Sequence, residues 1–214
     1  MTTANLTLRE EVDNLAQQLF GNKEAASDFA DQLMDICTRA IDKEFLVVHN
    51  PGGWGHARLD QCLEWERGIV YGVKGAIEEM GHSLLLTQYF RSGTGCWDKM
   101  RDLVEQFGFF SGKANVMEAW LQFIMAHINN IKVILVGISQ GAAFSSAVMM
   151  QLGGRYPVYS IELGFPFMYK SRRVVTERTL VVGGSGLGYD ALAQGNLWVG
   201  AGILIAAPFK WIWY

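Results

Sequence analysis

The sequence lacks any stretch in which basic residues gather. Its 214 residues contain 18 lysines and arginines against 21 aspartates and glutamates, which gives a formal net charge of -3. The cations are scattered along the chain, so no basic face is available to neutralise a phosphate backbone. We therefore expect no nucleic acid partner.

Cysteine is scarce as well. The three cysteines, Cys37, Cys62 and Cys96, include no pair with the CxxC spacing of a redox or metal site. Their odd number leaves at least one thiol free, which suits a reducing compartment. The N-terminal residues also lack the apolar central stretch of a secretory signal peptide. The expected location is the cytoplasm, with a peripheral membrane association as a further option.

Charged residues of either sign are few, at 18% of the chain, whereas hydrophobic residues make up 50%. A chain of this length and composition buries a sizeable core, so we expect residues 1–214 to form a single domain. Its last segment, from Leu197 to Tyr214, is strongly apolar and carries one charge, at Lys210. Two interpretations stay open: a final buried strand and helix, or a contact with a membrane surface or a second copy of the chain.

What is present is an alternation of apolar runs and helical patterns. Two helices are expected within residues 1–42, the first opened by a capping box at Thr7-Leu8-Arg9-Glu10. Strands are expected at residues 44–49, 83–90, 132–138, 158–163 and 179–182, with helices at 61–80, 116–128 and after 142. Near-continuous apolar strands separated by helices predict a sheet covered on both faces. The expected fold is a three-layer α/β sandwich with a mostly parallel sheet of about five to six strands.

Ligands of such sheets bind at the carboxyl ends of the strands. One of the loops there reads Gly137-Ile138-Ser139-Gln140-Gly141, between a buried strand and a helix that opens with small residues. Glycine has no side chain to obstruct the close approach of strand and helix across a sharp turn. Ser139 would then project at the helix N-terminus, where free N–H groups favour a developing oxyanion.

With Ala142, this loop resembles the G-x-S-Q-G-A elbow of cutinase-like serine esterases in the α/β-hydrolase superfamily. The loop His49-Asn50-Pro51-Gly52-Gly53 is similar to the H-G-x-x-G type oxyanion loop of that family, with Asn50 where a glycine is common. The resemblance implies an α/β-hydrolase-like fold over roughly residues 44–190. It also implies that Ser139 is the nucleophile and that N–H groups of Gln140 and of Gly52 or Gly53 bind the oxyanion.

The resemblance further implies an acid and then a histidine after the nucleophile. Asp190, which follows the expected strand at 179–182, stands where the family places the acid, although it would also suit a helix N-cap. Glu162 is a second choice. No histidine follows Ser139. This matters because a serine hydroxyl is a poor nucleophile until a neighbouring base takes its proton.

Three explanations for the missing histidine stay open. His56 or His49 could act as the base in an unusual arrangement, with His56 better placed beyond the glycine turn, or either could simply hydrogen-bond the backbone. The chain could instead be a degenerate hydrolase, since a fold does not guarantee an activity. It could also be a fragment whose histidine lies beyond Tyr214. His82 and His127 are expected to be structural.

Other motifs are weaker. The glycines at 183–188 suggest a dinucleotide loop, but the third glycine of G-x-G-x-x-G is absent, and no cluster has metal-ligand spacing. We therefore expect neither cofactor nor metal. Trp54, Trp97 and Phe165 follow strands at the same sheet edge, which suggests a substrate with an apolar body.

These patterns together predict a serine esterase or lipase-like hydrolase. Its substrate would be a small-molecule or lipid-like ester or thioester with an apolar acyl group, cleaved through an acyl-Ser139 intermediate. The alternative is a catalytically degenerate α/β-hydrolase-fold protein that binds a ligand, a partner or a membrane without turnover.

Overall fold

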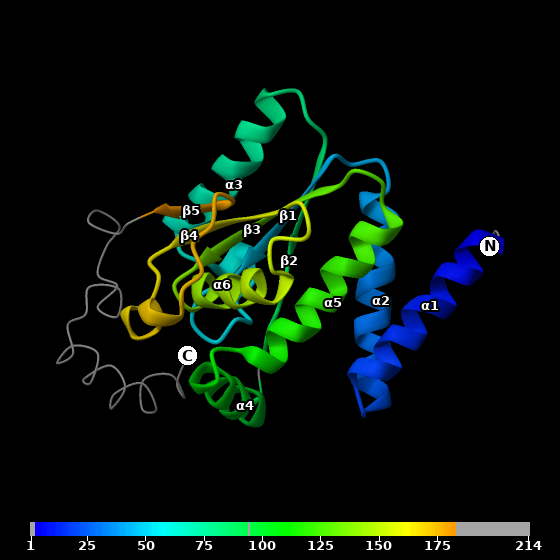
Figure 1. Ribbon diagram of the computed structural model, residues 1–214, viewed down its shortest axis with the longest axis horizontal. Coiled ribbons are helices and arrows are strands. Elements are labelled where there is room, and N and C mark those ends of the chain that lie inside the picture. Colours follow the sequence, from blue (N-terminus) through cyan, green and yellow to red (C-terminus); the bar gives the residue numbers. More distant parts are fainter. Residues whose placement is uncertain (1–2, 94, 183–214) are drawn as a thin grey trace.

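The computed structural model describes residues 3–93 and 95–182. This part of the chain contains one sheet of five parallel strands, β1 (Phe45–Asn50), β2 (Leu84–Gln88), β3 (Lys132–Ile138), β4 (Val158–Leu163) and β5 (Thr179–Val182). They lie in the order β2-β1-β3-β4-β5 (Figure 1). The predicted parallel sheet is confirmed.

Helices cover both faces of the sheet. The described helices are α1 (Thr3–Leu19), α2 (Lys23–Ala40), α3 (Glu64–Glu79), α4 (Cys96–Phe107), α5 (Ser111–His127) and α6 (Gln140–Leu152), with 3-10 turns η1 (Leu59–Gln61) and η2 (Phe167–Arg172). Figure 1 shows α3 on one face, α2, α5 and α6 on the other, and α1 outside α2. This is the expected three-layer α/β sandwich.

The alternation of side chains along each strand decides which layer they meet. Leu46 and Val48 of β1 join the core beneath α2, α5 and α6, whereas Val47 between them joins the smaller core beneath α3. Because both faces are covered, both sets of side chains are apolar, and the strand reads as a continuous hydrophobic run. This is why the strands could be recognised from the sequence.

One expectation about the helices was wrong, and one helix was not predicted. Thr7 lies inside α1, which begins at Thr3, so the residues Thr7-Leu8-Arg9-Glu10 do not open the helix. Residues 96–107 form α4, a helix that the sequence analysis did not predict. Within residues 3–93 and 95–182, no helix is both long and apolar enough to cross a bilayer.

The strand order places a topological switch between β1 and β3. The chain leaves β1 for β2 on one side and then returns past β1 to β3 on the other. In doubly wound sheets of this order, ligands bind at the crevice beyond the carboxyl ends of these two strands. The loop that follows Asn50 and the turn at Ser139 both lie there.

Candidate functional site

Ser139 has a strained backbone. It joins β3 to α6 with φ 52° and ψ -119°, a combination that non-glycine residues rarely adopt. The turn is held from both sides, because the Ser139 N–H donates to Leu163 O at 2.9 Å and its carbonyl accepts from the Ala142 N–H at 2.9 Å. Such strain costs about 1–3 kcal/mol and clusters at functional sites. The geometry is that of a serine raised at the tip of a sharp strand-to-helix turn.

The two glycines around Ser139 have the steric role that the sequence predicted. A Cβ on Gly137 would lie 2.5 Å from Gly141 O and 2.7 Å from Ala142 Cα, and one on Gly141 would overlap the carbonyl of Asn50. Real Cβ atoms do not approach the backbone so closely. Any side chain at either position would therefore force α6 away from the sheet.

The loop after β1 packs directly against this turn. A Cβ on Gly52 would lie 3.1 Å from Ile138 O and 3.6 Å from Ser139 Cβ, so Gly52 and Ser139 are neighbours. Asn50 joins the loop to α6, because its Nδ2 donates to Ser145 Oγ at 2.8 Å and Ser145 in turn donates to Gly141 O at 2.9 Å. This bond gives a structural reason for an asparagine at position 50.

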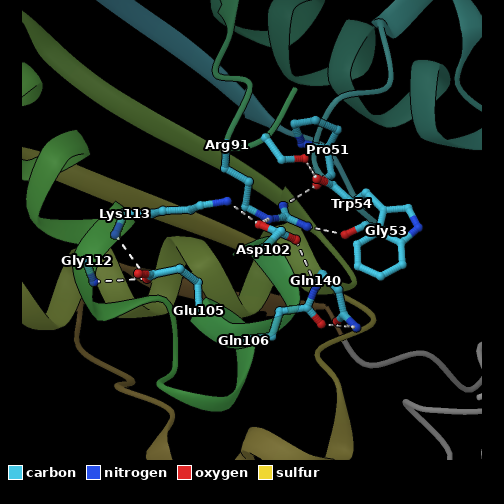
Figure 2. A network of polar contacts seen from close by, with 11 residues as sticks. Pro51, Gly53, Trp54, Arg91, Asp102, Glu105, Gln106, Gly112, Lys113 and Gln140 are labelled. Atoms are coloured by element: carbon cyan, nitrogen blue, oxygen red, sulfur yellow. Dashed lines mark hydrogen bonds and ion pairs between the residues drawn. The ribbon is translucent and has the colours of Figure 1, made fainter. Parts of the chain in front are cut away.

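The same loop is anchored from its other side by Arg91, which lies just after β2. Its guanidinium donates to Pro51 O at 2.7 Å and to Gly53 O (Figure 2). A trans peptide places its N–H opposite its C=O, so the N–H of Gly52 points away from Arg91. Ser92 Oγ adds a bond to Trp54 O. The carbonyls of Pro51, Gly53 and Trp54 are therefore turned toward Arg91 and Ser92.

Arg91 is held in turn by Asp102 of α4, whose carboxylate lies 3.4 Å from Arg91 Nε and 2.7 Å from Lys113 Nζ. Gln106 also donates to Asp102, at 2.8 Å, and its Oε1 lies 3.5 Å from Nε2 of Gln140, the residue after Ser139. Figure 2 shows this chain of contacts between the two loops. Gln140 and the Gly52-Gly53 loop, the two expected sources of oxyanion donors, are thus linked through one network.

Burial shapes the electrostatics of the network. Asp102 is fully buried and Arg91 is 5% exposed. Desolvation lowers the pKa of Arg91 to about 10, opposed by the charge of Asp102. The guanidinium also lies over the Phe110 ring, 5.2 Å from its centroid. Arg91 therefore keeps its charge at neutral pH and holds the loop carbonyls by charged donors.

The structure separates the two candidate bases. His49 is fully buried on the α3 face, with Nε2 3.0 Å from Glu66 Oε1 and Nδ1 3.0 Å from Gln88 Nε2. Both ring nitrogens are therefore engaged. The next residue, Asn50, faces α6 instead. This geometry makes His49 a structural residue that ties β1 to α3 and β2.

His56 lies in the loop at the carboxyl edge, and its Nδ1 is buried without a hydrogen-bond partner in the described part of the chain. Burial lowers the pKa of His56, and the charges of Lys99 and Arg91 lower it further. A neutral imidazole at neutral pH can accept a proton. His82 and His127 bind Glu44 and Glu11 instead, so the structure gives each an acidic partner away from Ser139.

The candidate acids are less informative. Glu162 is buried on β4, and its carboxylate lies 2.6 Å from Arg173 Nη2. Burial raises the pKa of Glu162, and the charge of Arg173 opposes that shift. Asp190 lies outside the described residues, as do Leu197 and Tyr214 with the segment between them.

The three aromatic residues expected around the substrate have different surroundings. Trp54 is half-buried in the loop beside Ser139, and Trp97 is 81% exposed on the first turn of α4. Phe165 is buried in the core, with Arg173 over its ring at 4.3 Å. Of the three, Trp54 is the one whose loop contacts the serine turn through Gly52.

Sequence reasoning missed Arg91, Asp102 and Lys113. An arginine after a strand at the carboxyl edge and a polar pair at i and i+4, Asp102 and Gln106, were the available signals. Within the part of the chain that the structure describes, no group of His, Cys, Asp and Glu could hold a metal ion. All three cysteines are described, and none is paired.

No protein-family model matches the chain, and no curated protein matches its sequence. What the site can do is therefore inferred from its own geometry.

Proposed function

We propose that the chain is a serine hydrolase that cleaves an ester or thioester with an apolar acyl group through an acyl-Ser139 intermediate. The observation that carries the proposal is the strained backbone of Ser139, φ 52° and ψ -119°, with Gly52 packed against it. Strain of this kind persists only where the surroundings impose it, and active sites are a common place for it. The unpaired cysteines suit the cytoplasm as the proposed location.

In the proposed reaction, Ser139 Oγ attacks the carbonyl carbon while a base removes its proton. The oxyanion is bound by the backbone N–H of Gln140, at the N-terminus of α6, and by an N–H of the Gly52-Gly53 loop. The bond to the leaving alkoxide or thiolate then breaks, and the base returns the proton to that group. Water, deprotonated by the same base, hydrolyses the acyl-serine and restores Ser139.

His56 is the proposed base. It lies in the loop that follows β1, its Nδ1 has no hydrogen-bond partner among the described residues, and its pKa is lowered by burial and by nearby cations. These properties keep the ring neutral and able to accept a proton near neutral pH. The acid of the proposed triad is Asp190.

A second candidate is a binding protein that keeps the pocket without turnover. One observation bears on it: the side chain of Ser139, the N-cap of α6, makes no capping hydrogen bond to the helix. Catalytic hydrogen bonds are often long in free enzymes, so this geometry is compatible with both candidates. Chemical reactivity of Ser139 separates them.

The test is labelling of the intact protein with a fluorophosphonate probe, followed by mass measurement. A hydrolase gives one adduct per chain, and Ser139→Ala gives none. His56→Gln should slow labelling by about 10²- to 10⁴-fold, the range for loss of a general base. His82→Gln, at the opposite edge of the sheet, is the matched control and should label at the wild-type rate. No adduct on the folded wild-type chain would favour the binding protein.

A further inference from the structure

Arg91 contacts the loop after β1 through both its backbone and its side chain. Its guanidinium donates to Pro51 O at 2.7 Å and to Gly53 O (Figure 2). Its backbone N–H donates to Gly55 O at 3.0 Å. Gly55, at φ 73°, leaves room for the arginine, because a Cβ there would lie 2.7 Å from Arg91 Cζ and 2.8 Å from Arg91 Nε. The loop is therefore folded around this side chain.

The guanidinium bond to Pro51 sets the orientation of one peptide group beside the serine. The loop has trans peptides, so each N–H points opposite to the carbonyl of the same peptide. Because Arg91 holds Pro51 O, the Gly52 N–H is directed away from the guanidinium. Gly52 also packs against the serine turn, where a Cβ on it would lie 3.6 Å from Ser139 Cβ. The arginine thus orients an N–H that belongs to a neighbour of Ser139.

The Gly53 N–H belongs to the next peptide, which a different contact holds. The carbonyl of that peptide, Gly52 O, accepts from the Gly55 N–H at 3.0 Å and closes a turn within the loop. Arg91 binds the carbonyls of the two flanking peptides instead, at Pro51 and Gly53. Of the two glycines considered as sources of an oxyanion donor, Gly52 is therefore the one whose N–H Arg91 orients.

The guanidinium is held on its other sides as well. Its Nε lies 3.4 Å from the carboxylate of Asp102, and both side chains are buried. Its Cζ lies over the rings of Phe110 and Phe144, 5.2 Å and 6.0 Å from their centroids. Phe144 belongs to α6, the helix that begins at Gln140, whose backbone N–H is the other proposed donor. Arg91 thus packs between the loop and the helix that supply the two donors.

We propose that Arg91 is a positioning residue that aims the Gly52 N–H at the oxyanion formed when Ser139 attacks the substrate. This inference rests on the proposed hydrolysis and assigns one of its donors. A guanidinium suits the task, because its planar fork reaches two carbonyls at once while Nε faces Asp102. A lysine ammonium is a single point of charge and cannot reproduce that geometry.

The first test is Arg91→Lys in the full chain, with hydrolysis of p-nitrophenyl butyrate as the assay. The variant keeps a positive charge beside Asp102 and loses the fork. An oxyanion donor acts in the transition state, so kcat should fall about 10²- to 10³-fold while KM stays within about threefold. The matched control is Arg67→Lys, since Arg67 also donates to a backbone carbonyl, Asp60 O at 3.1 Å, and this variant should behave like the wild type.

A pair of variants tests the donor itself. Gly52→Pro removes the N–H, whereas Gly52→Ala keeps the N–H and adds the same Cβ, which would lie 3.1 Å from Ile138 O. The kcat of the proline variant should be about 10²-fold or more below that of the alanine variant. Equal kcat values in the two variants would overturn the assignment of Gly52 as the donor.

A third readout does not depend on turnover. In NMR spectra of protein made with isotope-labelled glycine, the Gly52 amide is identified by its loss in Gly52→Ala. Its resonance should move in Arg91→Lys and stay in place in Arg67→Lys. An unmoved resonance would show that Arg91 does not orient this peptide.

The outcomes separate the two proposals. A wild-type chain that neither hydrolyses the ester nor reacts with the fluorophosphonate would overturn the hydrolase and with it the oxyanion role, and the Gly52 resonance would still show whether Arg91 holds the loop. An active wild type whose kcat is unchanged in Arg91→Lys would overturn the positioning role alone. Far-ultraviolet circular dichroism and urea unfolding check that each variant folds. If Arg91→Lys does not fold, Arg91→Met with Asp102→Leu takes its place in the same assay.

Discussion

Helices α6 and α4 flank the same site, yet opposite kinds of contact hold them. Ten of the 13 residues of α6 are buried, and most are small or apolar. Helix α4 buries two residues, and both are polar. Helix α6 is positioned by close packing, because Gly137 and Gly141 let it approach the sheet. Helix α4 is positioned by ion pairs, because its Asp102 contacts Arg91 and Lys113.

The difference has a consequence for the site. Close packing determines position through contacts that cannot be compressed, so α6 fixes Ser139 closely. A buried ionic network is satisfied or broken as a unit, so α4 and the carbonyls of Pro51, Gly53 and Trp54, which Arg91 and Ser92 hold, should respond together. Substitutions in the two helices should therefore differ in kind as well as in size.

The largest effect on stability is expected at the N-terminus of α6. Gly141→Ala would place a Cβ inside the carbonyl of Asn50, so we expect destabilisation beyond the usual 1–3 kcal/mol of an overpacked core and little folded protein. Gly75→Ala on α3 is the matched control, since a Cβ there meets nothing and should stabilise the helix by up to about 1 kcal/mol. Urea unfolding measures both. A Gly141→Ala protein as stable as wild type would contradict the close contact.

The next effect is expected in α4. Asp102→Asn removes the carboxylate that pairs with Arg91 and Lys113, and losing one partner of a buried pair costs about 3–5 kcal/mol. The matched control is Glu78→Gln on α3, whose exposed pair with Lys74 should contribute under about 1 kcal/mol. Urea unfolding midpoints compare the two.

A second variant separates stability from site geometry. Replacing Arg91 by Met and Asp102 by Leu together removes both charges of the fully buried pair and leaves only Lys113, whose side chain is 20% exposed, without its partner, so the loss of stability should be smaller than for Asp102→Asn. The Pro51 and Gly53 carbonyls would still lose their donor, so fluorophosphonate labelling of Ser139 should remain slow in the folded double variant. Wild-type labelling of that variant would show that the network does not position the loop.

The same contrast explains what could be predicted from the sequence. The strands and α6 could be recognised because apolar packing leaves a periodic pattern in the sequence. The turn at Ser139 could be recognised because only glycine fits at positions 137 and 141, where a Cβ would clash with nearby backbone atoms. Helix α4 has an equally periodic pattern, but its apolar side chains face solvent, and its buried side chains, Asp102 and Gln106, are polar. Which side turns inward depends on Arg91 and Lys113, which lie outside the helix on either side of it, and the periodicity of α4 itself does not contain that information.

The histidine question shows the same limit. His49 lies in β1 and His56 lies in the loop after it. Their positions in the sequence therefore made either one a candidate base. Their roles separate through contacts from Glu66 and Gln88 to His49, which come from α3 and β2. Long-range contacts of this kind follow from the fold, so they become visible once α3 and β2 are placed against β1.

The smallest expected effect joins α4 to the site through charge alone. Lys99 is one of the cations that lower the pKa of His56, so Lys99→Gln should raise that pKa, although burial, the larger cause, would remain. A His56 pKa below its unfolded value means that the unfolded chain binds the proton more tightly, so stability falls as the pH drops from the unfolded pKa to the folded pKa, and the variant, by narrowing that gap, should make the loss smaller. If His56 is the base, the acid limb of the pH–rate profile of hydrolysis should move to higher pH with its pKa.

NMR titration of the His56 ring measures the change in pKa directly, and Lys74→Gln on α3 is the matched control that should leave the pKa unchanged. An unmoved His56 resonance in Lys99→Gln would mean that α4 and the histidine are electrostatically independent, and the effect of α4 on the site would then be confined to the Arg91 network.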